Sequence, residues 1–157
     1  MTKKIKTALI TILPLLLLAC GFKPLSQRFD NQVYIQNIDI EADKSIAYSL
    51  KNNILFLSNE NSENKYDVKI QIKKNQRNKI KDKSGKTTRY GVTLTANLEL
   101  TNLNNKIIKT KTFSRSADYD ESKIYSDTIE NKKSAIKNII ETLSSDIVNF
   151  IVISSRF

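Results

Sequence analysis

The residues that decide the fold are YDVKIQIKKNQRNKIKDKSGKTTRYGVTLTANLEL, residues 66–100. Apolar residues alternate with polar ones at both ends of this stretch, over residues 66–72 and 90–100. Such alternation is typical of β-strands that place one face on a core. The apolar residues of both runs occupy even positions, so an antiparallel pairing that keeps them on one face needs a loop of odd length. The stretch therefore predicts a long β-hairpin.

A three-residue turn over residues 84–86 satisfies this condition, because Gly85 tolerates the positive φ that tight turns often require. This turn places Ile72 opposite Leu98. Apolar residues thin out after Ile72, so we expect the tip of the hairpin to project beyond the core.

A strand and a helix are predicted before the hairpin. Apolar residues alternate over residues 33–40, but the phase slips between Asn37 and Ile38, which indicates a β-bulge. Apolar residues then recur at helical spacing over residues 46–57. Asp43 precedes this helix at the position of an N-cap.

Another strand and a long helix are predicted after the hairpin. Asn104 and Asn105 indicate a turn, and the weakly patterned residues 107–115, with their lysines, suit a strand at a sheet edge. The C-terminal helix is expected to start near Asp127. Its predicted core stripe is Ile136, Ile140, Leu143, Ile147 and Phe150.

The predicted order of elements is strand, helix, three strands, helix. This order favours the α+β class: a two-layer sandwich with two helices packed on one face of a four-stranded mixed sheet. A chain of 157 residues is long enough for one such core but not for two. We therefore expect a single domain over residues 33–157, and we assign the apolar stripes to its core rather than to a cofactor site.

The first nineteen residues have the layout of a secretory signal peptide. Lys3, Lys4 and Lys6 form a positive start, residues 8–18 are uncharged and mostly apolar, and Ala19 is small. A membrane-spanning helix needs roughly 20 apolar residues, which is more than this run provides. The pattern predicts export of the chain rather than anchoring by a transmembrane helix.

Cys20 is the only cysteine of the chain. The sequence LLAC, residues 17–20, resembles the lipobox of bacterial lipoproteins, in which the signal is cut before the cysteine and the thiol carries a diacylglycerol. We interpret residues 20–32 as a lipidated tether that holds the protein at the membrane through this lipid. By resemblance to sorted lipoproteins, Gly21 in place of aspartate favours release to the outer membrane, where the protein would be anchored on the periplasmic side. The alternative is an ordinary signal peptide followed by a buried or accidental cysteine.

Positive charge is concentrated in the hairpin. Of 26 basic residues, three lie in the signal peptide, which leaves 23 against 16 acidic residues. Residues 73–89 contain eight of them and one acidic residue, Asp82, while the remaining 15 basic and 15 acidic residues balance. The eight candidate binding residues are Lys73, Lys74, Arg77, Lys79, Lys81, Lys83, Lys86 and Arg89.

An anionic partner would explain this concentration of charge. Phosphorylated lipid is the favoured partner, because an exported, lipid-anchored chain rarely meets nucleic acid and only Tyr90 is available nearby for stacking on bases. The alternative is a solvated ribbon that reflects a compositional bias toward lysine. Such a bias should spread lysines along the whole chain.

Catalysis is disfavoured by the composition. The chain has no histidine, which excludes a Ser-His-Asp or Cys-His arrangement. A single cysteine cannot form an intramolecular disulfide or a thiolate zinc site. We therefore expect a protein that is not an enzyme and that uses no metal or cofactor.

Three segments resemble one family. CGFKPL, residues 20–25, is similar to the start of mature lipopolysaccharide-assembly lipoproteins of the LptE family, particularly its alphaproteobacterial branch, although Ser26 replaces a typical tyrosine. TRYGVTLTA, residues 88–96, resembles the central strand of that family. The last third is similar at Tyr119, Asp120, Ser122 and Tyr125.

The resemblance implies a function in the outer membrane. LptE proteins insert into the lumen of the β-barrel LptD, assist its assembly, bind lipopolysaccharide and form with the barrel the lipopolysaccharide translocon. Their fold places two helices against a four-stranded sheet. In this chain the hairpin would reach phosphates of lipid A and the inner core, or acidic residues of the barrel lumen. The alternative is an accessory lipoprotein of another envelope machine, such as a lipid-transport ABC system.

Overall fold

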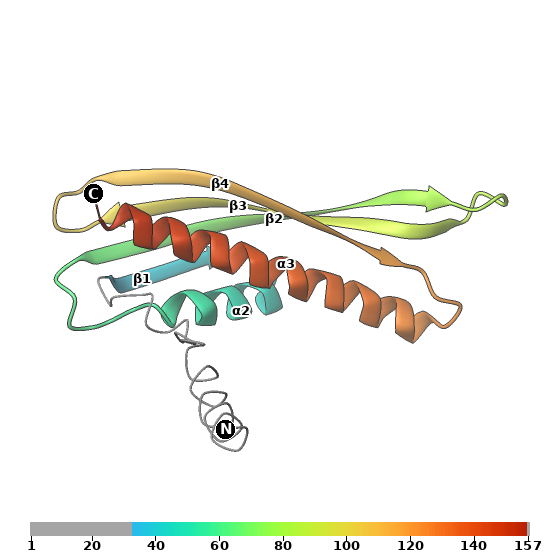
Figure 1. Cartoon of the computed structure of the whole chain (residues 1–157), viewed down its shortest axis with the longest axis horizontal. Coiled ribbons are helices and arrows are strands. Elements are labelled where there is room, and N and C mark those ends of the chain that lie inside the picture. The colour runs from blue at the N-terminus through green and yellow to red at the C-terminus, as the bar shows by residue number, and fades with distance from the viewer. Residues whose placement is uncertain (1–32, 157) are drawn as a thin grey trace, which may run out of the picture. The chain divides into compact units, whose positions relative to one another are not determined.

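The computed structural model describes residues 33–156 (Figure 1). The order of elements agrees with the prediction: β1 (Tyr34–Glu41), α2 (Lys44–Leu55), β2 (Lys65–Lys81), β3 (Thr87–Asn102), β4 (Ile108–Asp120) and α3 (Tyr125–Ser154). The expected signal peptide, Cys20 and the tether to residue 32 lie outside the described residues. Neither described helix is long and apolar enough to cross a membrane.

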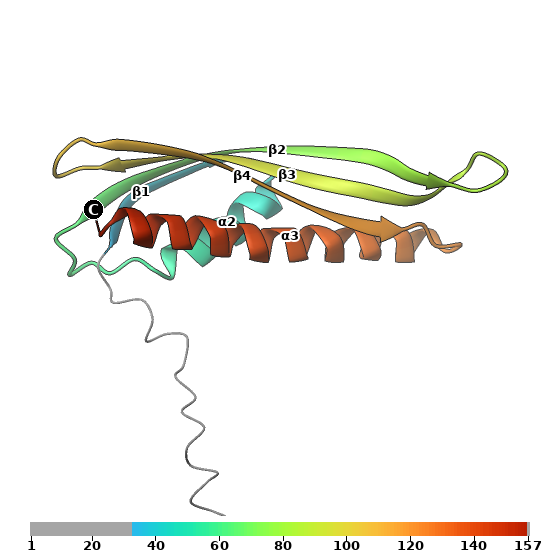
Figure 2. The ribbon, with the colours of Figure 1, turned by 45° about the horizontal axis from the view of Figure 1, so that its top comes forward.

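The four strands form one mixed sheet in the order β1-β2-β3-β4. β1 pairs with β2 in parallel, and the other neighbours are antiparallel. A parallel pair needs a crossover connection, which α2 provides here. Both helices cover the same face of the sheet (Figure 2). The α+β two-layer class is therefore confirmed, with β2 and β3 as the central strands.

The core lies between the sheet and the two helices. The even-numbered residues of β2 from Tyr66 to Ile70 and of β3 from Val92 to Leu100 are buried, as the alternation predicts. The stripe predicted for α3 was partly wrong, because Ile136 and Phe150 are only half-buried. α3 packs on β3, β4 and α2 together, so its buried face is wider than one stripe. The buried apolar residues of α3 are Ala135, Ile139, Ile140, Leu143, Ile147, Val148 and Ile151.

α3 begins at Tyr125, two residues before the predicted start at Asp127. The preceding loop folds back on the first turn of the helix, where the Ser122 N–H donates to Thr128 Oγ1 at 2.8 Å. Asp127 therefore lies in the first turn, where a carboxylate interacts favourably with the positive end of the helix dipole.

The predicted hairpin register was wrong by two residues. Ile72 pairs with Ala96, not with Leu98. The Asp82 N–H donates to the Lys86 carbonyl at 2.9 Å, so the three-residue turn is residues 83–85, one position earlier than predicted. The loop length is odd as expected, and Gly85 has a φ of 85°.

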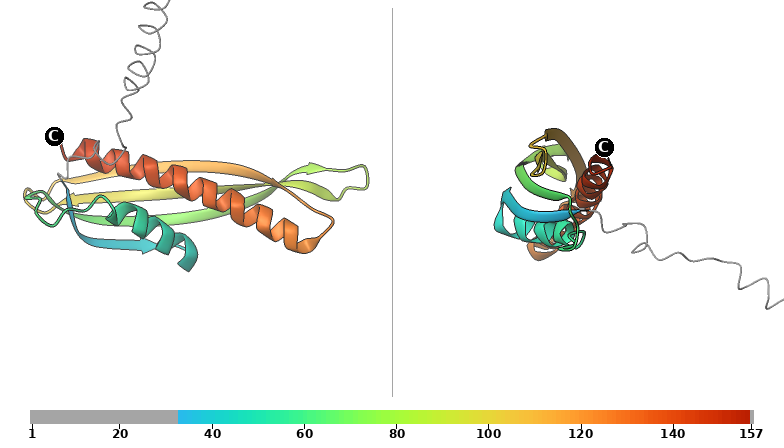
Figure 3. Two further views of the ribbon diagram at one scale, coloured as in Figure 1. Left: turned by 60° about the horizontal axis from the view of Figure 1, so that its bottom comes forward. Right: turned by 90° about the vertical axis from the view of Figure 1, so that its left-hand side faces the viewer.

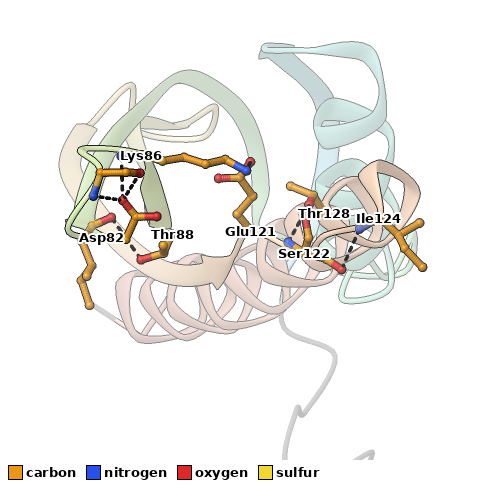
Figure 4. A network of polar contacts seen from close by, with 9 residues as sticks. Asp82, Lys86, Thr88, Glu121, Ser122, Ile124 and Thr128 are labelled. Atoms are coloured by element: carbon orange, nitrogen blue, oxygen red, sulfur yellow. Dashed lines mark hydrogen bonds and ion pairs between the residues drawn. The ribbon is translucent and has the colours of Figure 1, made fainter.

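The Asp82 carboxylate explains this position of the turn (Figure 4). Its Oδ1 accepts hydrogen bonds from the Ser84 N–H at 2.8 Å, the Ser84 hydroxyl at 2.6 Å and the Lys86 N–H at 3.0 Å. An aspartate that bonds to the backbone two residues on stabilises a turn that starts at the aspartate itself. The position of the turn is therefore set by a side chain that the alternation of apolar residues does not reveal.

β1 contains a bulge as predicted, but the extra residue is Gln36, and the register between Asn37 and Ile38, where the slip was expected, is regular. Ile35 pairs with Tyr66 and Asn37 pairs with Asp67, so Gln36 has no partner. Asp43 precedes α2 as predicted, but its side chain makes no capping hydrogen bond and instead forms an ion pair with Lys74.

The turn between β3 and β4 differs in detail from the prediction. The residue with positive φ is Lys106, at 60°, and not an asparagine. The Asn102 side chain accepts the Asn104 N–H at 2.9 Å. β4 is a sheet edge as expected and continues five residues beyond the predicted end at Arg115, to Asp120.

Candidate functional site

The outer half of the hairpin projects beyond the core. β1 ends opposite Gln71, whereas β2 continues to Lys81. All side chains of residues 73–86 are exposed. The hairpin tip extends past the first turn of α3 (Figure 1). This finding confirms the expectation that the basic tip stands clear of the core.

Four of the eight basic residues are neutralised by partners from other elements. Asp43 precedes α2, and the remaining partners lie at the end of β4 and just after it. The ion pairs are Lys74 with Asp43, Lys79 with Asp118 at 2.7 Å, Lys86 with Glu121 at 3.2 Å and Arg89 with Asp120 at 2.6 Å. Exposed pairs of this kind contribute little to stability, so they position the side chains more than they stabilise the fold.

Arg89 forms the best-defined of these pairs. Its Nε and Nη2 donate to the two carboxylate oxygens of Asp120 at 2.6 and 3.3 Å. The hydrogen bond from Arg89 lowers the pKa of Asp120, and the same contact raises the pKa of Arg89. Both groups therefore stay charged at neutral pH, and Arg89 clamps β3 to the end of β4.

Lys79 reaches its partner by crossing over β3. A Cβ at Gly91 would lie 3.0 Å from Lys79 Cε and 3.3 Å from Asp118 Oδ1. The absence of a side chain at Gly91 thus provides the space that the methylene groups of Lys79 occupy. The glycine of the TRYG segment is explained by this close approach.

The other four basic residues, Lys73, Arg77, Lys81 and Lys83, form no ion pair within the described part of the chain. The hairpin has eight basic residues and Asp82, and four further carboxylates lie against it. The local excess of positive charge is therefore three rather than seven. Sequence reasoning treated all eight residues alike, but only half of them are unpaired.

A groove of about 300 Å³ lies beside the hairpin, on the face of the sheet that carries the helices. Tyr90 and Tyr119 stack in it with ring centroids 5.3 Å apart. Burial raises the pKa of the Tyr119 phenol and Tyr90 adds to the rise, while a hydrogen bond with the Gln76 side chain acts in the opposite direction. The lining also includes Lys86, Lys123, Tyr125 and Lys132.

Sequence reasoning did not connect these groove residues with the hairpin. Tyr119 and Tyr125 were noted only as points of family resemblance. Lys132 is more than forty residues from the hairpin turn in the sequence. It reaches the groove because α3 starts beside the hairpin and then runs back along the sheet (Figure 3). Tyr90 lies on a predicted strand, but Tyr119 lies beyond the predicted end of its strand at Arg115, so no pattern in the sequence indicated that the two rings stack.

The face of the sheet away from the helices is polar. Short hydroxyl and amide side chains bond across β3 and β4: Thr95 with Ser114 at 3.3 Å, and Thr112 to Asn97 at 2.9 Å. This face contains a shallow hollow of about 550 Å³ whose lining includes Glu41, Lys69, Gln71, Asn97, Glu99 and Lys111. In residues 33–156 no cluster of acidic side chains could hold a metal ion.

Solved structures of bacterial lipoproteins share this fold, although no family model and no curated protein matches the sequence. Rare lipoprotein B of Shewanella oneidensis superposes with a TM-score of 0.59 at 9% identity, over 76% of this chain and 96% of that one. A candidate lipoprotein of Caulobacter crescentus superposes with a TM-score of 0.58 at 10% identity, over 83% of this chain and 95% of that one. The chain has their fold. Lipoprotein B of Nitrosomonas europaea has the same fold: it superposes with a TM-score of 0.52 at 15% identity, over 84% of this chain and 90% of that one.

Acidification is expected to loosen the hairpin turn. The Ser84 hydroxyl, followed by backbone N–H groups and Lys86, lowers the pKa of Asp82. Because the pKa is lower in the folded state, the ionised carboxylate stabilises the turn fully at pH values above its ordinary pKa of roughly 4. This stabilisation is lost as the pH falls through the lower pKa of the folded state. Amide exchange at Ser84 and Lys86 should therefore become faster relative to the intrinsic rate as the pH falls. Asp82→Asn should remove this pH dependence, and equal profiles for both proteins would contradict the explanation.

Proposed function

We propose that this protein is an outer-membrane lipoprotein of the lipopolysaccharide translocon, of the LptE type. In this role it inserts into an LptD-like β-barrel, assists the assembly of that barrel and binds lipopolysaccharide, without catalysis. The observation that carries the proposal is the row of unpaired cations on a hairpin that projects from a fold shared with bacterial lipoproteins. The sequence resemblance to the LptE family supports the same function.

Binding of phosphorylated lipid fits the chemistry of the hairpin. The lysines Lys73, Lys81 and Lys83 act on phosphate as point charges, whereas Arg77 is able to bind it through two parallel hydrogen bonds. The adjacent groove adds phenolic hydroxyls and the ammonium groups of Lys123 and Lys132. The groove lies on the face that carries the helices, and Lys73 and Arg77 point to the other face, so an anionic lipid would meet positive charge on both sides of the ribbon and hydroxyl groups on one.

Insertion into a barrel fits the polar face of the sheet. The lumen of an outer-membrane barrel is polar, while its outer surface is apolar. The hydroxyl and amide groups of β3 and β4, including Thr95, Asn97 and Ser114, suit such a lumen.

The proposed membrane anchor can be tested by mass. We expect the protein purified from membranes to begin at Cys20 and to carry a diacylglycerol on its sulfur. Each buried methylene of the acyl chains contributes about 0.8 kcal/mol of membrane affinity, so more than one chain holds the protein firmly. Mass spectrometry of the N-terminal peptide measures both properties. A mature chain with a free thiol would contradict the lipid anchor.

Purification of the tagged protein from outer membranes tests the proposed function. We expect a large β-barrel to be recovered in equal amount. We also expect depletion of the protein to cause misassembly of the barrel and to reduce surface lipopolysaccharide. Normal barrel and normal lipopolysaccharide after depletion would favour an accessory role in another envelope machine.

A further inference from the structure

The outer half of β2 has an open edge. β1 pairs with β2 only between Lys65 and Gln71, and β2 continues to Lys81. No strand of the described domain pairs with residues 72–81 on the side that β1 occupies further back. Figure 3 shows β1 ending well before the hairpin tip. This edge therefore presents backbone groups to solvent.

The register identifies which backbone groups face this edge. The Lys65 carbonyl accepts the Leu103 N–H at 2.9 Å, so Lys65 directs its backbone groups toward β3. Successive residues of a strand in an antiparallel pair alternate between facing the partner strand and facing away from it. Odd residues of β2 therefore face β3, and the N–H and C=O groups of Lys74, Gln76 and Asn78 face the open edge.

Unpaired positive charge lies along the same edge. Even-numbered side chains of β2 point to the helices, as buried Ile70 shows, so Lys73 and Arg77 point to the opposite face. These two residues form no ion pair in residues 33–156. They are four residues apart, so one residue of the same face, Asn75, lies between them.

The edge of β4 differs in charge, although it is also open. Lys109 donates to the Ser154 carbonyl at 3.0 Å, and Arg115 forms an ion pair with Asp146 at 2.8 Å. Asp118 and Asp120 add negative charge at its end. In residues 33–156 the edge of β2 over residues 73–78 carries two cations without an ion pair or a side-chain hydrogen bond, Lys73 and Arg77, whereas β4 carries one, Lys111. The edge of β2 is therefore the more positive of the two.

We propose that the edge of β2 over residues 73–78 binds an extended segment of a partner protein as an added β-strand, and that acidic side chains at alternate positions of this segment pair with Lys73 and Arg77. Backbone pairing supplies affinity and the charges supply selectivity, as in other cases of strand addition. The bulge that follows Asn78 interrupts the register and limits the added strand to about six residues.

A second copy of this chain is not the expected occupant. Pairing of two such edges would bring cations of both copies within about 5 Å of one another, which is unfavourable. Lysine on a free edge also opposes pairing with neutral strands. An acidic strand removes both penalties. This inference goes beyond the proposed function and does not depend on lipopolysaccharide binding.

Binding of synthetic peptides to the full-length protein in detergent tests the proposal. The probe is a peptide of about ten residues with glutamate at every second position and threonine between. A matched peptide has lysine in place of glutamate, and a third is the glutamate peptide with N-methyl groups on alternate backbone nitrogens. We expect the glutamate peptide to bind, and both matched peptides to bind at least about tenfold more weakly.

A matched pair of variants locates the site. Gln76→Pro removes an N–H that faces the open edge and leaves the bonds between β2 and β3 in place, because proline is tolerated at such edge positions. Gln76→Ala retains that N–H and loses the same contact with Tyr119. We expect about tenfold weaker binding of the glutamate peptide to the proline variant than to the alanine variant.

Each of three results with the peptides would overturn the proposal: no binding of the glutamate peptide at millimolar concentration, equal binding of its N-methylated form, or equal binding to the two variants. If the proline variant does not fold, the N-methylated peptide on the unaltered protein decides. Edge pairing between copies would appear as dimers without peptide and would also overturn it. Lipopolysaccharide binding, measured on the same samples, distinguishes a failure of this proposal from a failure of the proposed function.

Discussion

Replacing Lys73, Arg77, Lys81 and Lys83 together by glutamine is expected to weaken lipopolysaccharide binding by about 100- to 1,000-fold at low salt. Each cation near an anionic lipid surface contributes about 1 kcal/mol, and 1.4 kcal/mol corresponds to a factor of ten, so four such residues act over roughly two to three decades. None of them has an ion-pair partner within the described domain, so their replacement removes no internal contact of that kind. Titration of the detergent-solubilised protein with lipopolysaccharide measures the effect.

The chain offers a matched control in its four paired cations. Glutamine at Lys74, Lys79, Lys86 and Arg89 removes the same total charge but acts on side chains already held by Asp43, Asp118, Glu121 and Asp120. We expect a much smaller loss of affinity from this variant than from the first. Raising the salt concentration to about 1 M, where the screening length is about 3 Å, should abolish most of the difference. Equal losses in both variants would mean that only the overall charge matters.

Leu143→Ala is expected to lower the free energy of unfolding by about 2–5 kcal/mol. Leu143 is fully buried on α3, which packs on β3, β4 and α2, so its truncation leaves a cavity where the two layers meet. A loss of this size is a large part of the total stability of a small domain, and the midpoint of thermal unfolding should fall by roughly 10 °C. Thermal and chemical denaturation of the purified protein measure the change.

Ser145→Ala is the control for this prediction. Ser145 lies on the exposed side of the same helix, two residues further on. Its replacement should change the free energy of unfolding by no more than about 0.5 kcal/mol, as is usual for surface positions. A comparable destabilisation by both substitutions would show that α3 does not bury the face described above.

The sheet could be predicted from the sequence because its signal is periodic. Even-numbered apolar residues in two runs required an odd loop and one shared face, and the hairpin has both. The position of the turn could not be predicted in this way, because it depends on hydrogen bonds of one side chain, Asp82. A carboxylate that fixes a turn has no periodicity, and in the sequence Asp82 looked like a single acidic residue in a basic segment.

The candidate site was predicted less completely than the fold. The basic residues are adjacent in sequence, so their concentration was visible, but the partners of Lys79, Lys86 and Arg89 lie some thirty or more residues away. Which cations are unpaired follows from the register of β3 with β4, and no local pattern encodes it. The groove with Tyr119 was missed for the same reason, since tertiary structure alone brings its lining together.

The arrangement of the ion pairs gives the hairpin two unlike sides. The carboxylates of Asp118, Asp120 and Glu121 lie on the side of β4, and the free charges of Lys73 and Arg77 lie on the outer part of β2. The electrostatic potential at the tip is therefore more positive on the β2 side than on the β4 side. An anion that diffuses toward the tip is attracted to the β2 side before any contact forms. Such a bias in the direction of approach would speed productive encounters and orient the arriving molecule.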